Sequence, residues 1–411
     1  MLKILMLVNW KVRYTDQEPA DLQPPDYVIP GEPYWFFRYF REEVQVDVVD
    51  IRSFPALEKL EREKLRFYVW QTLRALPRLH RYDVVLSHGM QSGVVLCLWR
   101  RLFGKGRCKH IVFDIGAFNS AREEGGSLRL MQFAGKSLDG VIYHTSGQKT
   151  YYEHCHPWLA ESARFIPYGA DTQFFDADHL TKGEKAPESA PEKPSPEPGT
   201  EVEEEVSPEP EIMADLRCGD GSDAAKGEEK AVWAPEEGPH SYILCIGYNK
   251  RDWDTLLAAF SQVDTQVHLR LIGNASLTSG DPRVEVLPGV PVRELCRQIS
   301  GSLFGVLPLE SFNYSFGQMT LLQQMLLGKA VIAADVPSLR DYVSDGVTAL
   351  TYPPKDAAAL AGRIRYLLAH PEERERIASA GRESVRTEYS EQIMAERIEE
   401  YIHEVMGDNS C

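Results

Sequence analysis

The residues from Ser315 to Asp335 have the types and spacing of an anion-binding loop and helix. Apolar side chains recur there at helical spacing, and Gly328 marks the end of a helix that we expect to start between Gln318 and Thr320. A glycine just ahead of that start lets a ligand approach the backbone. The unpaired N–H groups and the helix dipole then favour an anion such as a diphosphate. An ordinary helix–strand unit with a loop glycine is the alternative.

Two further polar residues stand at the ends of predicted strands. His88 closes the segment YDVVLSHG, and Asp114 stands near the end of HIVFDIG. A histidine or a carboxylate that faces a cleft can act as a general base. A strand-end Asp that caps a loop is at least as common, and a single histidine does not make a mechanism. Both interpretations stay open for both residues.

Strands alternate with helices along two stretches of the chain. In the first stretch, the apolar run from Leu2 to Val8 is typical of a parallel sheet covered on both faces. Helices are predicted at PYWFFRYFREE and from Leu57 to Leu79. The second stretch begins at Ser241, contains a short predicted helix at SLRDYVSDG, and ends in amphipathic helices. The pattern predicts an α/β fold of two Rossmann-like domains that face each other across a cleft, with ligands at the carboxyl ends of the strands.

The domain boundaries follow from a change in composition. Residues 181–238 carry 17 acidic and 6 basic residues, together with the phrases PEKPSPEPG and EVEEEV. Such a segment cannot bury enough apolar surface to fold. We therefore expect an N-terminal domain at 1–179, a disordered acidic insertion at 180–239 and a second domain at 240–390. A C-terminal helix at 391–411 is expected to pack back towards the first domain.

Charge and cysteine content limit the remaining function classes. The chain of 411 residues has a net charge of −16, of which −11 belongs to the acidic insertion, so the rest carries only about −5. Nothing in the sequence indicates nucleic-acid binding. Seven scattered cysteines without a CxxC pair favour a reducing compartment and suggest no zinc site. MLKILMLVNW reads as a first strand, and no run is long enough to span a bilayer. These features predict a cytoplasmic protein.

A set of phrases in a fixed order resembles the retaining GT-B glycosyltransferases of the glycosyl transferases group 1, or family 4, type. In the C-terminal half these are the segment Gly247 to Arg251 followed by LLAAF, LIGNAS, VEVLPGVPVREL, the segment Ser315 to Asp335, and VPSLRDYVSDGVTALTYPP. In the N-terminal half the resemblance rests mainly on MLKILMLVN, YDVVLSHG, DGVIYHTS and RFIPYGADTQFF. The resemblance implies the GT-B fold and a nucleotide-sugar donor.

The resemblance also implies which residues bind the donor. The phrase around Gly247 supplies basic side chains to the diphosphate, and the family's lysine falls on Arg251, whose guanidinium can hold a diphosphate in a bidentate manner. The family's neighbouring arginine falls on Tyr248, so Lys250 would have to compensate. A solvated turn is the alternative for Lys250 and Arg251. Leu287 and Pro288 would flank the nucleobase, although apolar residues there are equally expected of a core.

The sequence departs from the family at two positions that carry glutamates in many relatives. Counted back from Gly328, these positions fall on Ser315 and Gln323; with the frame set on Phe316 they fall on Tyr314 and Leu322. In either frame both carboxylates are missing. Amides and hydroxyls can still bond sugar or ribose hydroxyls but cannot relay protons. Some relatives carry similar SGQ-type phrases. The remaining expected donor contacts are Gly317, Gln318, Met319 and Thr320.

Three features of the N-terminal half complete the expected site. Relatives place a histidine near the anomeric carbon, and here Asp114 occupies or adjoins that position, with His88 at a neighbouring strand end. Gly31 matches the family's N-terminal glycine loop. Retention in the family is attributed to front-face attack steered by the leaving diphosphate, which demands anion stabilisation. We therefore expect no essential metal and no cofactor besides the nucleotide-sugar substrate.

A peripheral membrane contact is a further possibility, with a lipid-linked acceptor. In the helix expected from Leu57 to Leu79, the side chains of Leu65, Val69, Leu73 and Leu76 form an apolar face among basic residues. WRRLFGKGRCKH adds a second basic cluster. The alternative is a surface helix with its charges in water.

The sequence favours a hexosyltransferase that moves a sugar from a nucleotide donor to a glycan, a lipid-linked acceptor or a small molecule. A catalytically silent GT-B protein that binds a sugar nucleotide or glycan is the rival, because both glutamates are missing. A hydrolysing epimerase or a phosphorylase is disfavoured, since nothing resembles the additional acid–base groups of those enzymes.

Overall fold

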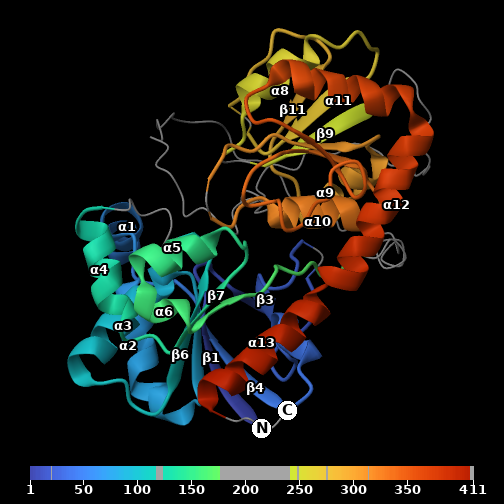
Figure 1. Cartoon of the computed structure of the whole chain (residues 1–411). Coiled ribbons are helices and arrows are strands. Elements are labelled where there is room, and N and C mark those ends of the chain that lie inside the picture. The colour runs from blue at the N-terminus through green and yellow to red at the C-terminus, as the bar shows by residue number, and fades with distance from the viewer. Residues whose placement is uncertain are drawn as a thin grey trace, which may run out of the picture.

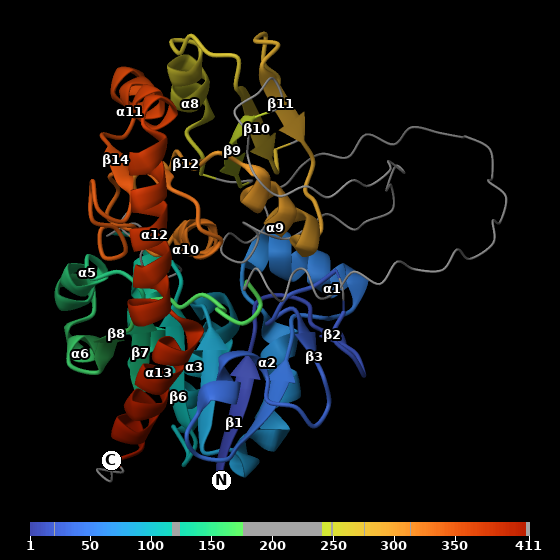
Figure 2. The same ribbon diagram turned by 90° about the vertical axis from the view of Figure 1, so that its right-hand side faces the viewer.

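The computed structural model describes residues 1–19, 21–116, 124–175, 241–247, 250–274, 276–312 and 314–407. The predicted acidic insertion at 180–239 and the position of Tyr248 lie outside these residues. Two α/β domains lie one above the other, the N-terminal domain below and the C-terminal domain above (Figures 1 and 2). The prediction of an α/β protein with two Rossmann-like domains is confirmed.

The N-terminal domain is built on a parallel six-stranded sheet in the order β4-β1-β5-β6-β7-β8. Its strands are β1 (Leu2–Leu7), β4 (Val44–Val49), β5 (Val84–His88), β6 (Lys109–Asp114), β7 (Gly140–Tyr143) and β8 (Ala163–Phe165). Strand β5 is buried at every position, because helices cover both faces of the sheet. A short parallel pair, β2 (Arg13–Tyr14) with β3 (Tyr27–Val28), lies in the long loop after β1.

The helices of this domain differ from the predicted ones in two places. They are α1 (Pro55–Leu60), α2 (Val69–Ala75), α3 (Met90–Phe103), α4 (Gly126–Gly135), α5 (Gln148–Cys155) and α6 (Pro157–Ala160). PYWFFRYFREE forms only a 3₁₀ helix, η1 (Trp35–Tyr39). Its aromatic rings are buried, and it packs against the C-terminal helix.

The predicted single helix from Leu57 to Leu79 is wrong. After α1 comes a π-helical turn that ends at Arg66 in the left-handed conformation, followed by α2 and a 3₁₀ helix (Leu76–Arg81). The buried carboxylate of Glu61 accepts the N–H of Trp70 at 2.8 Å, which ties the turn to the start of α2. Gln71 points inward and donates to the carbonyls at the ends of β1 and β4, whereas Leu73 is 48% exposed. The expected apolar face therefore does not exist as one surface.

The C-terminal domain has the strand order β11-β10-β9-β12-β13-β14, again all parallel. Its strands are β9 (Tyr242–Ile246), β10 (His268–Ile272), β11 (Val284–Leu287), β12 (Gly305–Leu307), β13 (Val331–Ala334) and β14 (Leu350–Tyr352). Its helices are α8 (Trp253–Phe260), α9 (Val292–Gly301), α10 (Gln318–Leu326) and α11 (Ala357–Ala369). SLRDYVSDG forms turns rather than the predicted short helix; in it, Tyr342 is buried and bonds across to the other domain.

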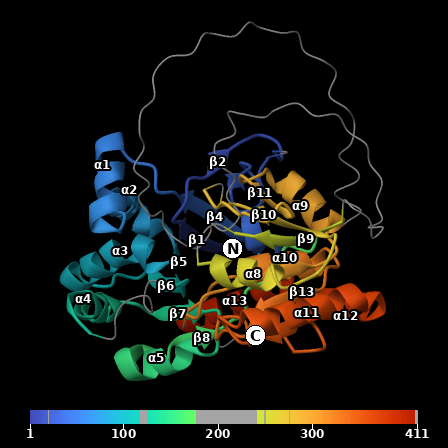
Figure 3. The same ribbon diagram turned by 90° about the horizontal axis from the view of Figure 1, so that it is seen from above.

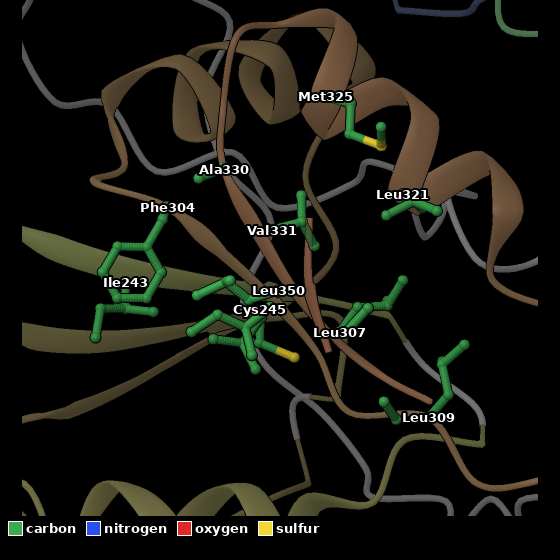
Figure 4. Packing of buried hydrophobic residues seen from close by; sticks show 14 of the residues in the cluster. Ile243, Cys245, Phe304, Leu307, Leu309, Leu321, Met325, Ala330, Val331 and Leu350 are labelled. Carbon is green, nitrogen blue, oxygen red and sulfur yellow. The ribbon is translucent and has the colours of Figure 1, made fainter. Parts of the chain in front are cut away.

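Helix α10 sits on one face of this sheet because its inner side is apolar. Leu321 and Met325 are fully buried beside Val331 of β13 and Leu307 of β12 (Figure 4). Fully burying one such side chain contributes roughly 1.5–3 kcal/mol. The packing holds the first turn of α10 at the carboxyl end of β12.

Two long helices run from the upper domain to the lower one. Helix α12 (Pro371–Glu388) packs on α10, and α13 (Glu391–Met406) packs on η1 of the N-terminal domain. Figure 2 shows them as one red line along both domains. Met394, Ile398 and Ile402 of α13 belong to the N-terminal core. Helix α13 follows the C-terminal domain in the sequence but completes the core of the N-terminal domain.

Candidate functional site

The strand order of the C-terminal domain sets the location of a ligand site. The chain winds away from β9 towards β10 on one side and returns at β12 on the other, so β9 and β12 flank a topological switch point. In open α/β sheets, ligands bind at that point, outside the carboxyl ends of the strands. Backbone hydrogen bonds join the segments after β9 and β12 there. The N–H of Asp252 donates to the carbonyl of Pro308 at 2.7 Å, and the N–H of Glu310 donates to the carbonyl of Lys250 at 3.1 Å.

Arg251 connects the segment after β9 with the first turn of α10. Its Nε donates to the carbonyl of Ile246 at 2.9 Å, and its Nη2 lies 3.4 Å from the hydroxyl of Thr320. The side chain is 4% exposed, and the guanidinium lies over the ring of Phe316, 5.3 Å from its centre. A Cβ at Gly247, where φ is +139°, would lie 2.5 Å from the guanidinium atoms. Only glycine leaves room for this arginine.

Lys250 places a second cation beside the same helix. Its Nζ lies 4.6, 4.4 and 5.5 Å from the ring centres of Phe312, Tyr314 and Phe316. Such geometry favours a cation over the faces of the rings. The backbone of Lys250 is left-handed, with a φ of +56°. Both basic residues after β9 thus direct their charge towards the loop that precedes α10.

The N-terminus of α10 has the features of an anion site. Gly317 precedes the helix with a φ of +83°, and a Cβ there would meet Leu309 at 2.5 Å, so the position requires glycine. Gly317 has no side chain to cap the helix, which leaves the first N–H groups, at Gln318, Met319 and Thr320, without an intrahelical acceptor. No acidic residue stands in the first turn. The helix dipole, Arg251 and Lys250 together favour a negatively charged group there.

Leu322 and Gln323, the two positions expected to correspond to the second glutamate of many relatives, lie in different surroundings. Leu322 is fully buried in the apolar core of its own domain. Gln323 instead lines a small cavity between the domains, and its Oε1 is buried with no hydrogen-bond partner in the described part of the chain. Gln323, the position counted back from Gly328, is therefore the one that faces the other domain. Ser315 is buried at the start of the same loop.

The cavity beside Gln323 lies where the two domains meet. It has a volume of about 20 Å³, which is room for about one water molecule. Residues of both domains line it: Gln23, Pro24, Trp35, Tyr168, Gly169, Ala170, Asp171, Phe175, Met319, Gln323 and Glu391. Met319 also packs against the N-terminal core. Helix α10 is therefore in contact with both domains.

A buried cluster of charges next to the cavity was not predicted. The Nη2 atom of Arg38 lies 2.6 Å from a carboxyl oxygen of Asp171 and 2.6 Å from a carboxyl oxygen of Glu391. Burial and the nearby Asp171 raise the pKa of Glu391 to about 8. The three residues come from η1, from the segment after β8 and from the start of α13. The turn IPYGAD and the start of α13 at Ser390 mark two of these positions in the sequence, but nothing there indicates that they meet.

The two chain crossings between the domains touch each other. Ala170 and Ser390 form a parallel bridge, and a Cβ at Gly169 would lie 2.5 Å from the carbonyl oxygen of Ser390. Tyr342 of the upper domain donates to the carbonyl of His144 at 2.5 Å and accepts the N–H of Tyr168 at 2.8 Å. These contacts join the two domains beside the place where the chain crosses between them.

The residues expected at the nucleobase lie at the end of β11. Leu287 is half-buried and Pro288 is exposed, and the carbonyl of Leu287 accepts the N–H of Gly273 at 3.1 Å. Leu287 packs against a small apolar cluster that includes Ile246 and Leu295. Both residues stand at the carboxyl edge of the sheet that holds Arg251, and the structure leaves their expected contact with a base as a prediction.

His88 does not face the cleft, contrary to the prediction. It is 1% exposed, and its Nδ1 lies 3.2 Å from the side-chain oxygen of Asn9. Its ring is packed against Trp10, Trp35 and Phe113, with centres 4.8, 5.7 and 5.9 Å away. The imidazole is packed among aromatic residues of the N-terminal core.

Asp114 is likewise occupied within its own domain. Its carboxylate accepts hydrogen bonds from the N–H of Gly116 at 3.1 Å, from Gln148 at 2.9 Å and from the hydroxyl of Tyr152. The residue is completely buried. Burial and this carboxylate raise the pKa of Tyr152 well above its usual value. The arrangement ties β6 to α5, which fits the loop-capping alternative better than a catalytic base.

Gly31 lies in an exposed turn ahead of η1. Its φ is +89°, and no atom lies within 4 Å of a Cβ built there. The conformation favours glycine and leaves the backbone open to a ligand. Whether donor or acceptor approaches it stays a prediction.

Among the described residues, one group of carboxylates and imidazoles has its ligand atoms within 4.8 Å of one another: Glu42, Glu399 and His403. His403 pairs with Glu42 at 3.0 Å, and Glu399 accepts the N–H groups of Arg41 and Glu42. These bonds attach the loop after η1 to α13, away from α10. The expectation that the donor site needs no metal is not tested by this group.

The C-terminal domain matches a known family. Residues 240–370 match the model of the family described as Glycosyl transferases group 1. No curated protein is significantly similar in sequence to this chain. The matched residues include both basic residues after β9 and the whole of α10.

Solved structures resemble the whole chain. Sucrose-phosphate synthase from Thermosynechococcus elongatus superposes with a TM-score of 0.63 at 16% identity, over 98% of this chain and 99% of that one. HepE of Anabaena, in complex with UDP and glucose, gives a TM-score of 0.62 at 14% identity, over 98% and 100%. The catalytic domain of starch synthase IV from Arabidopsis thaliana, bound to ADP and acarbose, gives 0.64 at 11%, over 99% of each chain.

These likenesses establish the architecture as that of the GT-B glycosyltransferases. Within the described residues, no helix is both long and apolar enough to cross a bilayer. The protein thus has the GT-B fold, and its residues 240–370 match the family described as Glycosyl transferases group 1.

Proposed function

We propose that this protein is a glycosyltransferase that takes a hexose from a nucleoside-diphosphate sugar and transfers it, with retention, to a glycan, a lipid-linked acceptor or a small molecule. One observation carries the proposal. The buried side chain of Arg251 occupies the space that a Cβ at Gly247 would take. It reaches the uncapped first turn of α10 at Thr320, 69 residues further along the chain. A diphosphate is the group that this combination of guanidinium and helix N-terminus suits.

The chain's own residues would act mainly on the leaving group. The N–H groups of Gln318, Met319 and Thr320 would hold phosphate oxygens, and Arg251 and Lys250 would neutralise the charge that builds up as the sugar departs. Charge stabilisation of this kind is often the largest single contribution to catalysis. For Arg251 to reach the ligand, its guanidinium must exchange part of its contact with Ile246 or Thr320.

The nucleotide is proposed from the relatives of similar fold. HepE is described in complex with UDP and glucose, and starch synthase IV with ADP and acarbose. We therefore propose a uridine or adenosine diphosphate sugar, with the base near Leu287 and Pro288. The five cysteines in the described part of the chain are buried, and no disulfide joins them, which supports the proposal of a reducing, cytoplasmic location.

A second candidate function is a catalytically silent GT-B protein that binds a sugar nucleotide. Three observations favour it: Ser315 and Gln323 are not carboxylates, His88 is enclosed by aromatic rings, and Asp114 is occupied by internal donors. In that case the site at α10 would bind the donor without turning it over.

Donor binding and donor turnover separate the two candidates. The full chain would be titrated with UDP and ADP by calorimetry, and then incubated with UDP-glucose or ADP-glucose while free nucleotide is measured. Binding together with slow hydrolysis would support the transferase, because transferases release some sugar to water. Binding without any release of nucleotide from either donor would favour the silent protein. Absence of binding by both nucleotides would overturn the assignment of the site at α10.

A further inference from the structure

A group of large apolar side chains is exposed on one edge of the N-terminal domain. The residues lie at the carboxyl ends of α3 and α4 and on α6: Trp99 (41% exposed), Leu102 (68%), Phe103 (69%), Phe133 (44%) and Trp158 (38%). Single exposed apolar residues are ordinary on protein surfaces, but several together mark an interaction site.

Basic residues join these side chains into one surface. The rings of Trp99 and Phe103 lie 4.2 Å apart on α3. From the same helix, the guanidinium of Arg101 lies 5.5 Å from the ring centre of Phe133 on α4. From α4, the ammonium of Lys136 lies 5.2 Å from the ring of Trp158 on α6. We call the surface made by these residues and Leu102 the aromatic–basic surface.

The α3 and α4 segments of this surface carry charges of one sign, whereas α6 is followed by the exposed Glu161. No acidic residue occurs between Asp83 and Asp114 or between Glu124 and Asp139. Arg101, Arg107, Arg129 and Lys136 are all exposed. Asp139, the nearest carboxylate at the end of α4, is neutralised by Arg100 and Lys105 at 2.5 and 3.2 Å. This local positive charge stands out in a chain whose net charge is −16.

The surface faces away from the proposed donor site. Helix α3 begins beside the carboxyl end of β5 and has 14 residues, so its last turn lies about 20 Å from that end of the sheet. Helices α1 to α4 form one outer layer of the N-terminal domain, seen along the left edge of Figure 3. A large flat partner can cover this layer and leave the cleft between the domains open to solution.

We propose that the aromatic–basic surface binds an anionic lipid bilayer. Trp and Phe rings at the rim of a soluble domain are suited to the boundary between head groups and acyl chains, where an apolar ring gains burial. Arg and Lys side chains lie over those rings and can extend their charges to lipid phosphates, as amphipathic side chains do at membrane interfaces. The core of a protein–protein interface is instead depleted of lysine. The inference is independent of the proposed sugar transfer.

Vesicle flotation of the full chain tests this inference. Vesicles of phosphatidylcholine with about one third phosphatidylglycerol should carry the protein upward at low salt, and the bound fraction should fall at about 0.5 M salt. Vesicles of pure phosphatidylcholine should bind at least about fivefold less. The double variant W99S/F103S and the charge variant R101E/K136E should each lower binding to anionic vesicles at least about fivefold.

A matched control uses exposed apolar residues of the other domain. V347S/Y366S removes two such side chains from the C-terminal domain and should float like the unchanged protein. All variants should keep the melting temperature and the affinity for UDP, because these side chains are exposed and far from α10. The inference is overturned if the unchanged protein does not float with anionic vesicles, or if W99S/F103S and R101E/K136E float as well as it does.

Discussion

Arg38 and Glu391 lie 353 residues apart in the sequence, yet their side chains meet at 2.6 Å in the interior of the protein. Asp171 contacts the same guanidinium, so one guanidinium lies against two carboxyl groups. The cluster lies next to the place where the chain crosses between the domains, at Ala170 and Ser390. We expect the charged contacts of Arg38 and the close packing of Ala170 against Ser390 to contribute to the stability of the contact between the domains.

The contribution of Glu391 to the stability of the protein should fall as the pH rises from about 5 to about 8. Burial and Asp171 raise the pKa of Glu391 to about 8 in the folded chain, against an ordinary value of 4.5. Between these values the folded state holds a proton that the unfolded state has released. Each pH unit in that window therefore costs up to about 1.4 kcal/mol of unfolding free energy. Glu391→Gln should remove this downward contribution, which urea unfolding at several pH values measures. Glu396→Gln, on the exposed side of α13, should keep it; equal slopes for Glu391→Gln and the unchanged protein would refute the assignment.

Gly169→Ala should destabilise the contact between the two crossings. The added Cβ would lie 2.5 Å from the carbonyl oxygen of Ser390 and 2.8 Å from the Cα of Glu391. Backbone atoms cannot move aside cheaply, so we expect a loss of about 1–3 kcal/mol. Gly147→Ala is the control, because that residue has a φ of −61° and nothing within 4 Å. Thermal melting of both variants measures the difference. Equal melting temperatures would mean that the crossings tolerate separation.

Tyr342→Phe should cost about 1–3 kcal/mol of stability. The lost hydroxyl serves the carbonyl of His144 and the N–H of Tyr168, both across the domain boundary. Removing it leaves two backbone groups without this partner. Tyr366→Phe removes an exposed hydroxyl that makes one long bond to Glu373 and should change the unfolding free energy little. A loss of similar size in both variants would indicate that the interdomain bonds contribute nothing beyond a surface contact.

Substitution at Arg251 should weaken nucleotide binding more than substitution at Gln323. Reversal to Glu would give the largest loss of donor binding, but it also buries a carboxylate, so Arg251→Met is the cleaner change. A lost hydrogen bond between charged groups is worth about 1.5–3 kcal/mol, or about a 10- to 100-fold rise in the Kd for UDP. Gln323→Ala should raise that Kd less than about fivefold. Calorimetry with UDP measures both, with melting curves in its absence as a check on folding. The reverse ranking would place the diphosphate nearer to Gln323.

A chelator should leave donor turnover unchanged within about twofold, because the positive charge at α10 is proposed to come from Arg251, Lys250 and the helix dipole. The release of UDP from UDP-glucose would be compared with and without EDTA. Loss of turnover that added Mg²⁺ or Mn²⁺ restores would contradict this prediction.

Local patterns were enough to predict the architecture and the bounds of helix α10. Apolar runs of strand length separated by helical repeats correspond to most of the strands and helices of both sheets. The helix expected to start between Gln318 and Thr320 and to end near Gly328 spans Gln318–Leu326. The signals for such elements lie within a few residues of one another, because backbone hydrogen bonds and glycine conformations act locally.

The direction in which side chains point was decided by the tertiary structure. The sequence could not tell Gln323 from Leu322 as the residue that faces the other domain, since adjacent helical positions differ only in which neighbour buries them. His88 and Asp114 stand at strand ends as predicted. Their side chains are buried, however, where His88 bonds to Asn9 and Asp114 accepts from Gln148 and Tyr152.

The sequence by itself thus determined two Rossmann-like domains and a helix, α10, that follows Gly317. It also indicated Lys250 and Arg251 as the basic residues near that helix. The tertiary structure alone decided that Arg251 lies against Thr320 and that Arg38 joins Asp171 to Glu391. It also decided that the exposed aromatic residues of α3, α4 and α6 form one surface. The physical reason is that these contacts join segments far apart in the chain, and they form only when the packing of two cores brings those segments together.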